Sequence, residues 1–183
     1  MALALQKALD ECENNDAVRV IVLSGEGKAF CAGQDLAEVT DPQGPELKTI
    51  IGEHYNPIIT RIRNIEKPII AVVNGVAAGA GANIALACDI IFAKKSASFI
   101  QAFSKIGLIP DSGGTYFLPR IIGMQKAMAL MMTGDKVSAE EAEALKMIYK
   151  AVNDDEFDEV VSTFSLKLAQ MPTRALGLTK KAI

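Results

Sequence analysis

The sequence predicts an α/β fold with a parallel sheet that is covered on both faces. Three runs, at 18–23, 69–73 and 89–93, are apolar or β-branched almost throughout, which is typical of buried parallel strands. Nine of the 14 glycines fall in three stretches, at 25–33 and 75–81 and 107–114. Strands that alternate with helical segments indicate an α/β domain, and clustered glycines indicate sharp turns or a ligand held close to the backbone.

A helical segment precedes each of these strands. Residues 1–14 carry an apolar stripe at helical spacing. Residues 46–65 repeat isoleucine and leucine at the same spacing, with an interruption at Pro57. Residues 81–87 are small and apolar on every side, so we expect a helix inside the core.

Two further helices follow the last of these strands. The first covers 138–146, where Ser138 and Glu141 have the spacing of a capping box. The second covers 154–171, is amphipathic, and carries acidic residues in its first turn. Pro172 stops this helix, because proline cannot continue it.

Length, charge and cysteine content exclude several classes of protein. With 183 residues, half of them hydrophobic, the chain can bury its own core, so we expect a single domain over 1–183. A net charge of -3 provides no excess of positive charge for binding nucleic acid or an anionic membrane. No apolar run is long enough to span a bilayer, and the first segment is unlike a signal peptide. The three cysteines form neither a zinc pattern nor a disulfide framework, which is typical of the cytoplasm.

Three common active-site motifs can be rejected. The segment after Gly25 lacks the Ser or Thr that follows the lysine of a phosphate-binding loop. Ile84 stands where a dinucleotide fingerprint has its third glycine. There is no G-x-S-x-G motif and His54 is the single histidine, so we expect neither a serine triad nor a two-histidine metal site.

Two turns that follow strands remain as candidate binding elements. One lies within 23–36, and the other within 73–81, just before the predicted core helix. Each places backbone N–H groups at the end of a strand, and the second adds the positive end of a helix dipole. Two converging N–H groups are what an enolate or a tetrahedral oxyanion requires.

Four motifs follow one another along the chain. They are Phe30-Cys31-Ala32-Gly33-Gln34-Asp35-Leu36; Val73-Asn74-Gly75 with Gly79-Ala80-Gly81; Cys88-Asp89-Ile90; and Ile109-Pro110-Asp111-Ser112-Gly113-Gly114-Thr115 followed by Leu118-Pro119-Arg120. In this order they resemble the crotonase (enoyl-CoA hydratase/isomerase) superfamily. The resemblance implies a crotonase-like ββα spiral core, coenzyme A thioester substrates and stabilisation of a thioester enolate.

The resemblance also implies roles for individual residues. The oxyanion N–H groups are expected to be those of Gln34 and Ala80. The substrate is expected to lie along Ala32, Gln34, Asp35, Leu36, Ala37 and Gly79. No separate cofactor is implied, because coenzyme A is part of the acyl-CoA substrate. Family members assemble as homotrimers or dimers of trimers, which we also expect here.

The acids of the site distinguish branches of the family. Hydratases use two glutamates, and this sequence has Asn83 and Phe103 at those positions, which cannot supply acid–base catalysis to water. One acid remains, Asp111, whose sequence neighbours are apolar: Phe99, Phe103, Ile106, Leu108 and Ile109. Such surroundings raise the pKa of a carboxyl group that must take and return a proton. We expect Asp111 to be catalytic and Ser112 to cap the next helix.

Asn83 and Phe103 are both expected beside the substrate. Phe103 would line an apolar pocket that suits a six-carbon ring. Asn83 would bond an oxygen of that ring or orient Asp111, and a satisfied core amide is an equal alternative.

Three branches carry an aspartate in this loop. Dehalogenases of 4-chlorobenzoyl-CoA support this aspartate with a tryptophan, and dienoyl-CoA isomerases pair it with a second acid. The sequence has no tryptophan and no second acid at the expected position. It is most similar to the isomerases that convert ring 1,2-epoxyphenylacetyl-CoA to an oxepin thioester. Enolate-type isomerisation is therefore expected, with an enoyl-CoA hydratase and a non-catalytic acyl-CoA binder as alternatives.

The resemblance also sets expectations for the ends of the domain. Family members begin with a β-hairpin before the first helix and end with further helices. The sequence has no counterpart of either, so it predicts a core that lacks the N-terminal hairpin and the C-terminal helices.

Overall fold

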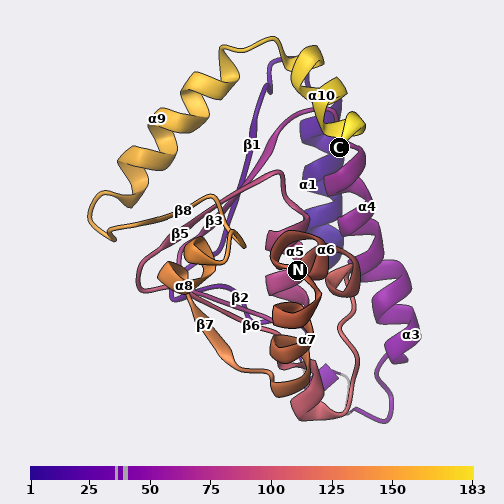
Figure 1. The fold of residues 1–183 in the computed structure, drawn as a ribbon. Helices are drawn as coiled ribbons and strands as arrows, with labels where there is room; N and C mark the ends of the chain where they lie inside the picture. The colour runs from indigo at the N-terminus through magenta and orange to yellow at the C-terminus, as the bar shows by residue number, and fades with distance from the viewer. Residues whose placement is uncertain (36, 39–40) are drawn as a thin grey trace.

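The computed structural model describes residues 1–35, 37–38 and 41–183, and two four-stranded sheets stand at its centre (Figure 1). The first sheet is parallel with the order β1-β3-β5-β8: β1 Ile21–Ser24, β3 Ile69–Val73, β5 Ile90–Lys94 and β8 Lys150–Val152. The second has the order β2-β4-β6-β7: β2 Ala29–Cys31, β4 Val76–Ala78, β6 Ser98–Ile100 and β7 Lys136–Ser138. Three times the chain passes from a strand of the first sheet into a strand of the second, which is the repeated unit that the resemblance predicts.

Helices surround the two sheets (Figure 1). Ser138 caps α8 as its spacing predicts, since its Oγ accepts a hydrogen bond from the Glu141 N–H at 3.1 Å. None of the described helices has both the length and the apolar character that a membrane crossing requires. The helices in chain order are α1 Ala2–Asn14, α3 Leu47–Thr49, the π-helix η1 Ile50–Tyr55, α4 Asn56–Asn64, α5 Ala80–Ala87, the 3₁₀-helix η2 Ala102–Ile106, α6 Gly114–Ile122, α7 Met124–Thr133, α8 Ala139–Ala144, α9 Phe157–Ala169 and α10 Thr173–Ala182.

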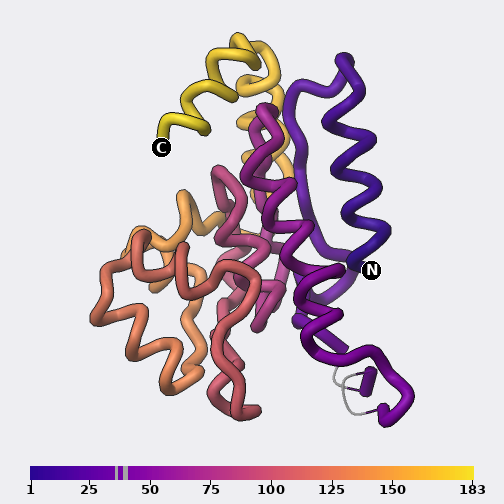
Figure 2. The backbone as a smooth tube through the Cα atoms, turned by 90° about the vertical axis from the view of Figure 1, so that its right-hand side faces the viewer, coloured from indigo at the N-terminus to yellow at the C-terminus, as the bar shows by residue number. Residues whose placement is uncertain are grey.

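Strand β3 of the first sheet is buried on both faces, as its apolar run predicts, whereas Val22 of the edge strand β1 is 48% exposed. Ile70 and Val72 of β3 belong to a cluster with Phe157 of α9, which lies across one face in Figure 1. The alternate residues of β3 belong to the main core, together with side chains of α1, α4 and α5. Figure 2 shows α1 and α4 side by side, with α10 near one end of the pair.

Helical structure covers most of the predicted range 46–65, and the expected interruption at Pro57 takes the form of a change of helix type. The π-helix η1 ends at Tyr55, and Pro57 lies in the first turn of α4. Pro57 has no N–H to donate to the carbonyl group of Glu53, four residues earlier. The side-chain amide of Gln6 donates to the carbonyl oxygens of Glu53 at 2.8 Å and His54 at 3.0 Å. The carbonyl group of Glu53, which lacks a donor from Pro57, and that of His54 therefore attach α1 to this helix.

Helix α5 lies directly against β2. A Cβ atom on Gly81 would be 2.1 Å from the carbonyl oxygen of Cys31, so only glycine permits this approach. The contact brings the segment after β2 beside the start of α5, where β4 also ends.

Candidate active site

Two turns converge at one edge of the second sheet. Gly33 and Gln34 follow β2, and Gly79 and Ala80 follow β4, which pairs with β2 in parallel. The carboxyl ends of parallel neighbours meet at the same edge, so the turns lie together. A Cβ atom on Gly33 would be 3.7 Å from the amide nitrogen of Ala80.

Both turns offer a backbone N–H group. Ala80 is the first residue of α5, so its N–H has no acceptor within the helix. Gly79, which precedes it, has φ +53° and ψ −126°, a conformation that side chains rarely permit. In the described part of the chain, the N–H of Gln34 has no hydrogen-bond acceptor. The geometry therefore leaves two neighbouring donors available to one oxyanion.

A cavity of about 370 Å³ opens at these turns. Its size lies in the range of small-molecule sites. Asp111 is the one carboxylate among the described residues that line it. The lining is otherwise mostly apolar: Ala32, Gly33, Gln34, Leu47, Gly79, Ala80, Ala102, Phe103, Ile106 and Leu108.

The surroundings of Asp111 favour its protonated form. Burial raises the pKa of its carboxyl group, and the hydrogen bond from Ser112 Oγ, at 2.8 Å, opposes that rise. Of the apolar neighbours named from the sequence, Phe103, Ile106 and Leu108 line the cavity with it. Phe99 of β6 is instead buried in the core, and Ile109 in the loop before Asp111 is 80% exposed.

A tight turn presents Asp111 to the cavity. Ser112 and Gly113 have φ +49° and +76°, and the Gly114 N–H donates to the Asp111 carbonyl oxygen at 2.8 Å, which makes a type I′ turn. Positive φ is unfavourable for serine, and such strain is concentrated at functional sites.

The predicted cap by Ser112 is wrong. Helix α6 begins at Gly114 and its N-cap is Gly113, with no side-chain cap. Because Ser112 lies inside the turn, its hydroxyl group points back to the Asp111 carboxylate instead.

Asn83 is wholly buried and has protein partners on both sides of its amide. Its Nδ2 donates to the Asp111 carbonyl oxygen at 2.9 Å, and its Oδ1 accepts from Gln101 Nε2 at 2.8 Å. It does not belong to the cavity lining. Of the three roles named from the sequence, this geometry fits orientation of Asp111 and a satisfied core amide.

Asp35 and Ala37 do not belong to the lining of this cavity. Asp35 is exposed, and its Oδ1 accepts from the Ala37 N–H at 2.9 Å, so the carboxylate closes a local turn. Ala37 is exposed as well. The predicted contact at Leu36 lies outside the described residues.

A polar cavity of about 460 Å³ adjoins the same turn and shares Gly33 and Gln34 with the first cavity. His54 is half-buried in its wall, and Glu38 accepts a hydrogen bond from the Gln34 side chain. Tyr55 also lines it, although only 3% of the residue is exposed. Burial raises the pKa of the Tyr55 phenol, and the charges of Cys31, Asp111 and Glu38 raise it further.

Tyr55 has no role assigned from the sequence, although Tyr55-Asn56-Pro57 is one of the motifs that resemble the family's epoxide isomerases.

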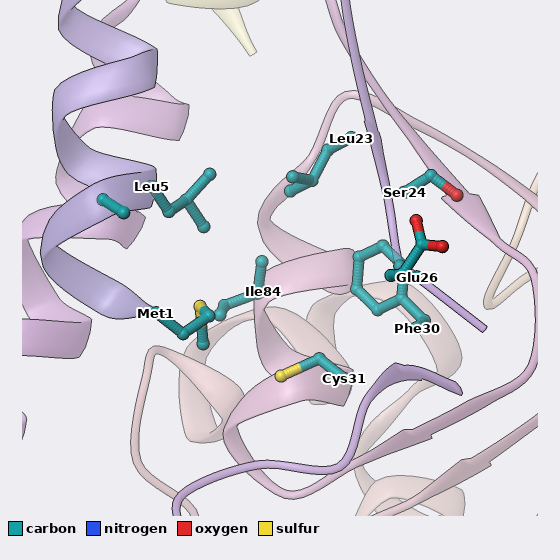
Figure 3. Close-up of a pocket in the computed structure, with 10 residues that line it drawn as sticks. Met1, Leu5, Leu23, Ser24, Glu26, Phe30, Cys31 and Ile84 are labelled. Carbon is teal, nitrogen blue, oxygen red and sulfur yellow. The ribbon is translucent and has the colours of Figure 1, made fainter. Parts of the chain in front are cut away.

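A third cavity lies between α1 and β1 and has a volume of about 350 Å³ (Figure 3). Leu5, Leu23 and Ile84 approach it from three different elements, with Cys31 below them in the view. None of the predicted site residues that the structure describes lines it. The candidate chemistry is therefore concentrated in the cavity that contains Asp111.

Comparisons with known proteins agree on one family. The family model described as Enoyl-CoA hydratase/isomerase matches residues 1–183. The 1,2-epoxyphenylacetyl-CoA isomerase of Escherichia coli K12 is 45% identical over 186 residues, covering 100% of this chain and 71% of that protein. The 4-chlorobenzoyl coenzyme A dehalogenase-1 of an Arthrobacter species is 35% identical over 191 residues, covering 100% of this chain and 67% of that protein.

A solved structure extends the likeness to three dimensions. The crystal structure of an enoyl-CoA hydratase from Mycobacterium avium subsp. paratuberculosis K-10 matches with a TM-score of 0.90 and 31% identity. The match covers 98% of this chain and 71% of that one. The chain spans about two thirds of the length of its curated relatives.

Proposed function

The chain belongs to the enoyl-CoA hydratase/isomerase family, and on that premise we propose that it is an isomerase of acyl-CoA thioesters. The observation that carries the proposal is a single carboxylate, Asp111, in an apolar cavity beside two free N–H groups. Such a set can move a proton and can stabilise the enolate that forms, and it contains no second acid for the activation of water.

In the proposed reaction, the thioester carbonyl oxygen accepts hydrogen bonds from the N–H groups of Gln34 and Ala80. Asp111 as carboxylate takes a proton from the α carbon, and the electron pair of that C–H bond moves into the enolate. The neutral carboxylic acid then returns the proton at the γ carbon, which restores the carbonyl group and shifts the double bond. No atom is gained or lost, and Asp111 ends as it began.

The raised pKa of Asp111 supports this role. A carboxylate of ordinary acidity is a weak base, and burial makes it stronger. The apolar cavity also excludes water, which strengthens both the oxyanion contacts and the proton transfer.

The acyl group that we propose is the ring 1,2-epoxide of a phenylacetyl thioester. In this substrate the C–C bond between the two epoxide carbons breaks and its electron pair joins the ring double bonds, which gives the oxepin. Asp111 then moves a proton from the α carbon to the γ carbon, so that no atom is gained or lost. The support is the 45% identity to the relative named for that substrate, and the fit of Phe103 and its apolar neighbours to a six-carbon ring. Coenzyme A belongs to the substrate, so no separate cofactor is required.

The test compares isomerisation with hydration in the same protein. A 3-enoyl-CoA thioester, the ring-epoxide thioester and crotonyl-CoA are supplied separately, and products are identified by mass spectrometry. We expect products of unchanged mass from the first two, and little addition of water to the third. In deuterated water, exchange at the α carbon should accompany turnover.

Two results would contradict the proposal. Efficient hydration of crotonyl-CoA would make the protein a hydratase. Tight binding of the thioesters without turnover or exchange would make it a non-catalytic acyl-CoA binder.

A further inference from the structure

A line of buried amides leads to the turn that carries Asp111. Gln101 Nε2 donates to Asn83 Oδ1 at 2.8 Å, and Asn83 Nδ2 donates to the Asp111 carbonyl oxygen at 2.9 Å. Asn83 is 0% exposed and Gln101 is 3% exposed. Both donors point toward the turn, and hydrogen bonds aligned in this way strengthen one another away from water.

The Asp111 carbonyl group is thus held from two directions. It accepts the Gly114 N–H, which closes the type I′ turn, and the Asn83 amide, which comes from α5. Ser112, whose φ is unfavourable for serine, directly follows the residue that these two hydrogen bonds hold. Unfavourable φ values persist where surrounding contacts over-determine them, and the Asn83 contact is one that the turn cannot supply for itself.

The fit around Asn83 is close. A Cβ atom on Gly114 would lie 2.4 Å from Asn83 Nδ2, so α6 begins directly against this amide. Gln101 immediately precedes η2, whose residues Ala102 and Phe103 line the cavity. The amide line therefore connects three walls of the site, namely α5, η2 and the Asp111 turn.

The direction of the hydrogen bonds in this amide line is set by its two ends, Gln101 and the Asp111 carbonyl group. Within the described part of the chain, Gln101 Oε1 is buried without a hydrogen-bond partner, so the amide of Gln101 acts here as a donor alone. A donor is also what the Asp111 carbonyl group requires of Asn83. An acid in either position would present a lone pair where a proton is needed.

We propose that Gln101 and Asn83 are positioning residues, which hold the Asp111 carboxyl group in line with the carbon that exchanges its proton. Neither residue lines the cavity, so both act through Asp111. The inference rests on the proposed function, in which Asp111 carries the proton. A displacement of a reacting group by a fraction of an ångström is enough to slow a reaction strongly.

The test uses three variants of the full chain. Gln101→Met keeps the volume and removes the donor, and Gln101→Glu keeps the shape and donates only when it is protonated. Ser98→Ala is the matched control, because Ser98 is 1% exposed, lies in the adjacent strand β6, and its hydroxyl group has no partner. Circular dichroism confirms folding before each assay.

We expect Gln101→Met to lower kcat about ten-fold with little change in KM, since orientation rather than binding is lost. The ratio of kcat in Gln101→Glu to kcat in the wild type should be near one at low pH and should fall as the pH rises. Ser98→Ala should match the wild type throughout. A wild-type kcat in Gln101→Met, a pH-independent ratio for Gln101→Glu, or an equal loss in Ser98→Ala would overturn the inference.

A second measurement does not depend on turnover. Carboxyl ¹³C resonances report the titration of Asp111 in each folded variant. In Gln101→Met the loosened turn admits water, so the pKa of Asp111 should move back toward its ordinary value of 3.8. Identical titration in wild type and Gln101→Met would overturn the inference. Unchanged turnover in Asp111→Asn would instead overturn the proposed function, so the two failures can be distinguished.

Discussion

Asp89 and Asp111 are two partly buried aspartates with opposite surroundings. The carboxylate of Asp89 accepts hydrogen bonds from Lys180 Nζ at 2.8 Å, Arg63 Nη1 at 3.3 Å and the Ile69 N–H at 2.8 Å. The carboxylate of Asp111 accepts one hydroxyl group, from Ser112, and forms no ion pair within the described residues.

This difference indicates that Asp89 stabilises the fold, whereas Asp111 is available for proton transfer. Asp89 connects α4, β3 and α10, since its three partners come from these elements or their flanks. Neutralising it would leave cations without a partner in the interior. Asp111 has no cation to hold its charge, so it can lose that charge without breaking an ion pair. Substitutions at the two aspartates and their partners test this division.

The largest expected effect is on activity, from Asp111→Asn. The amide cannot accept and return a proton, so kcat for isomerisation should fall by about 10³-fold. The free energy of unfolding, measured with urea at pH 7, should be unchanged or higher, because the amide removes the cost of a buried charge. A parallel loss of stability would mean that Asp111 also holds the fold.

Asp89→Asn should give the opposite result. It leaves the ammonium group of Lys180, whose side chain is 6% exposed, without its counter-charge. Burial lowers the pKa of Lys180, and the hydrogen bond to Asp89 opposes that effect. We expect a loss of about 3 kcal/mol in the free energy of unfolding, with kcat of the folded protein nearly unchanged.

The double variant Asp89→Asn, Lys180→Met is the control for this prediction. It removes both charges and should recover part of the lost stability. If the double variant were destabilised by the sum of the two single changes, the ion pair would not explain the effect.

The apolar runs of the sequence predict the strands of the first sheet but not those of the second. Strands β1, β3 and β5 have four or five residues each and are apolar on both faces, so their runs stand out. The strands of the second sheet have three residues each, too few to display a period of two. Pro172 ends α9 as predicted, and it also serves as the N-cap of α10, a helix that the sequence reasoning did not include.

The residues of the site also fall into two groups. Local sequence motifs predict some of them, and the contributions of the others depend on contacts between distant parts of the chain. Gln34, Ala80, Phe103 and Asp111 follow from motifs, and the structure gathers them at one cavity, where their roles stay predictions. The contributions of Ser112 and Gln101 depend on contacts across the fold, such as the amide line through Asn83. Such contacts join residues that are far apart in the chain, so no local pattern reveals them.

The pH dependence of stability provides a finer test of the comparison. Because the pKa of Asp111 is raised in the folded state, its favourable contribution is complete below its ordinary value of 3.8. That contribution is lost as the pH rises through the folded value. The stability of the wild type relative to Asp111→Asn should therefore decrease from pH 4 to pH 7 in urea titrations. A constant difference between the two proteins would contradict the raised pKa.

The smallest expected effect comes from Ser112→Ala, which removes the one hydroxyl group that bonds the Asp111 carboxylate. That hydrogen bond lowers the pKa of Asp111, so its loss should raise the pKa further. The acid limb of the plot of kcat/KM against pH should then move upward, since Asp111 must be ionised to take a proton. On the plateau, activity should change little, because alanine keeps the turn and the amide line intact. A limb that moved downward would show that Ser112 stabilises the neutral acid rather than the carboxylate of Asp111.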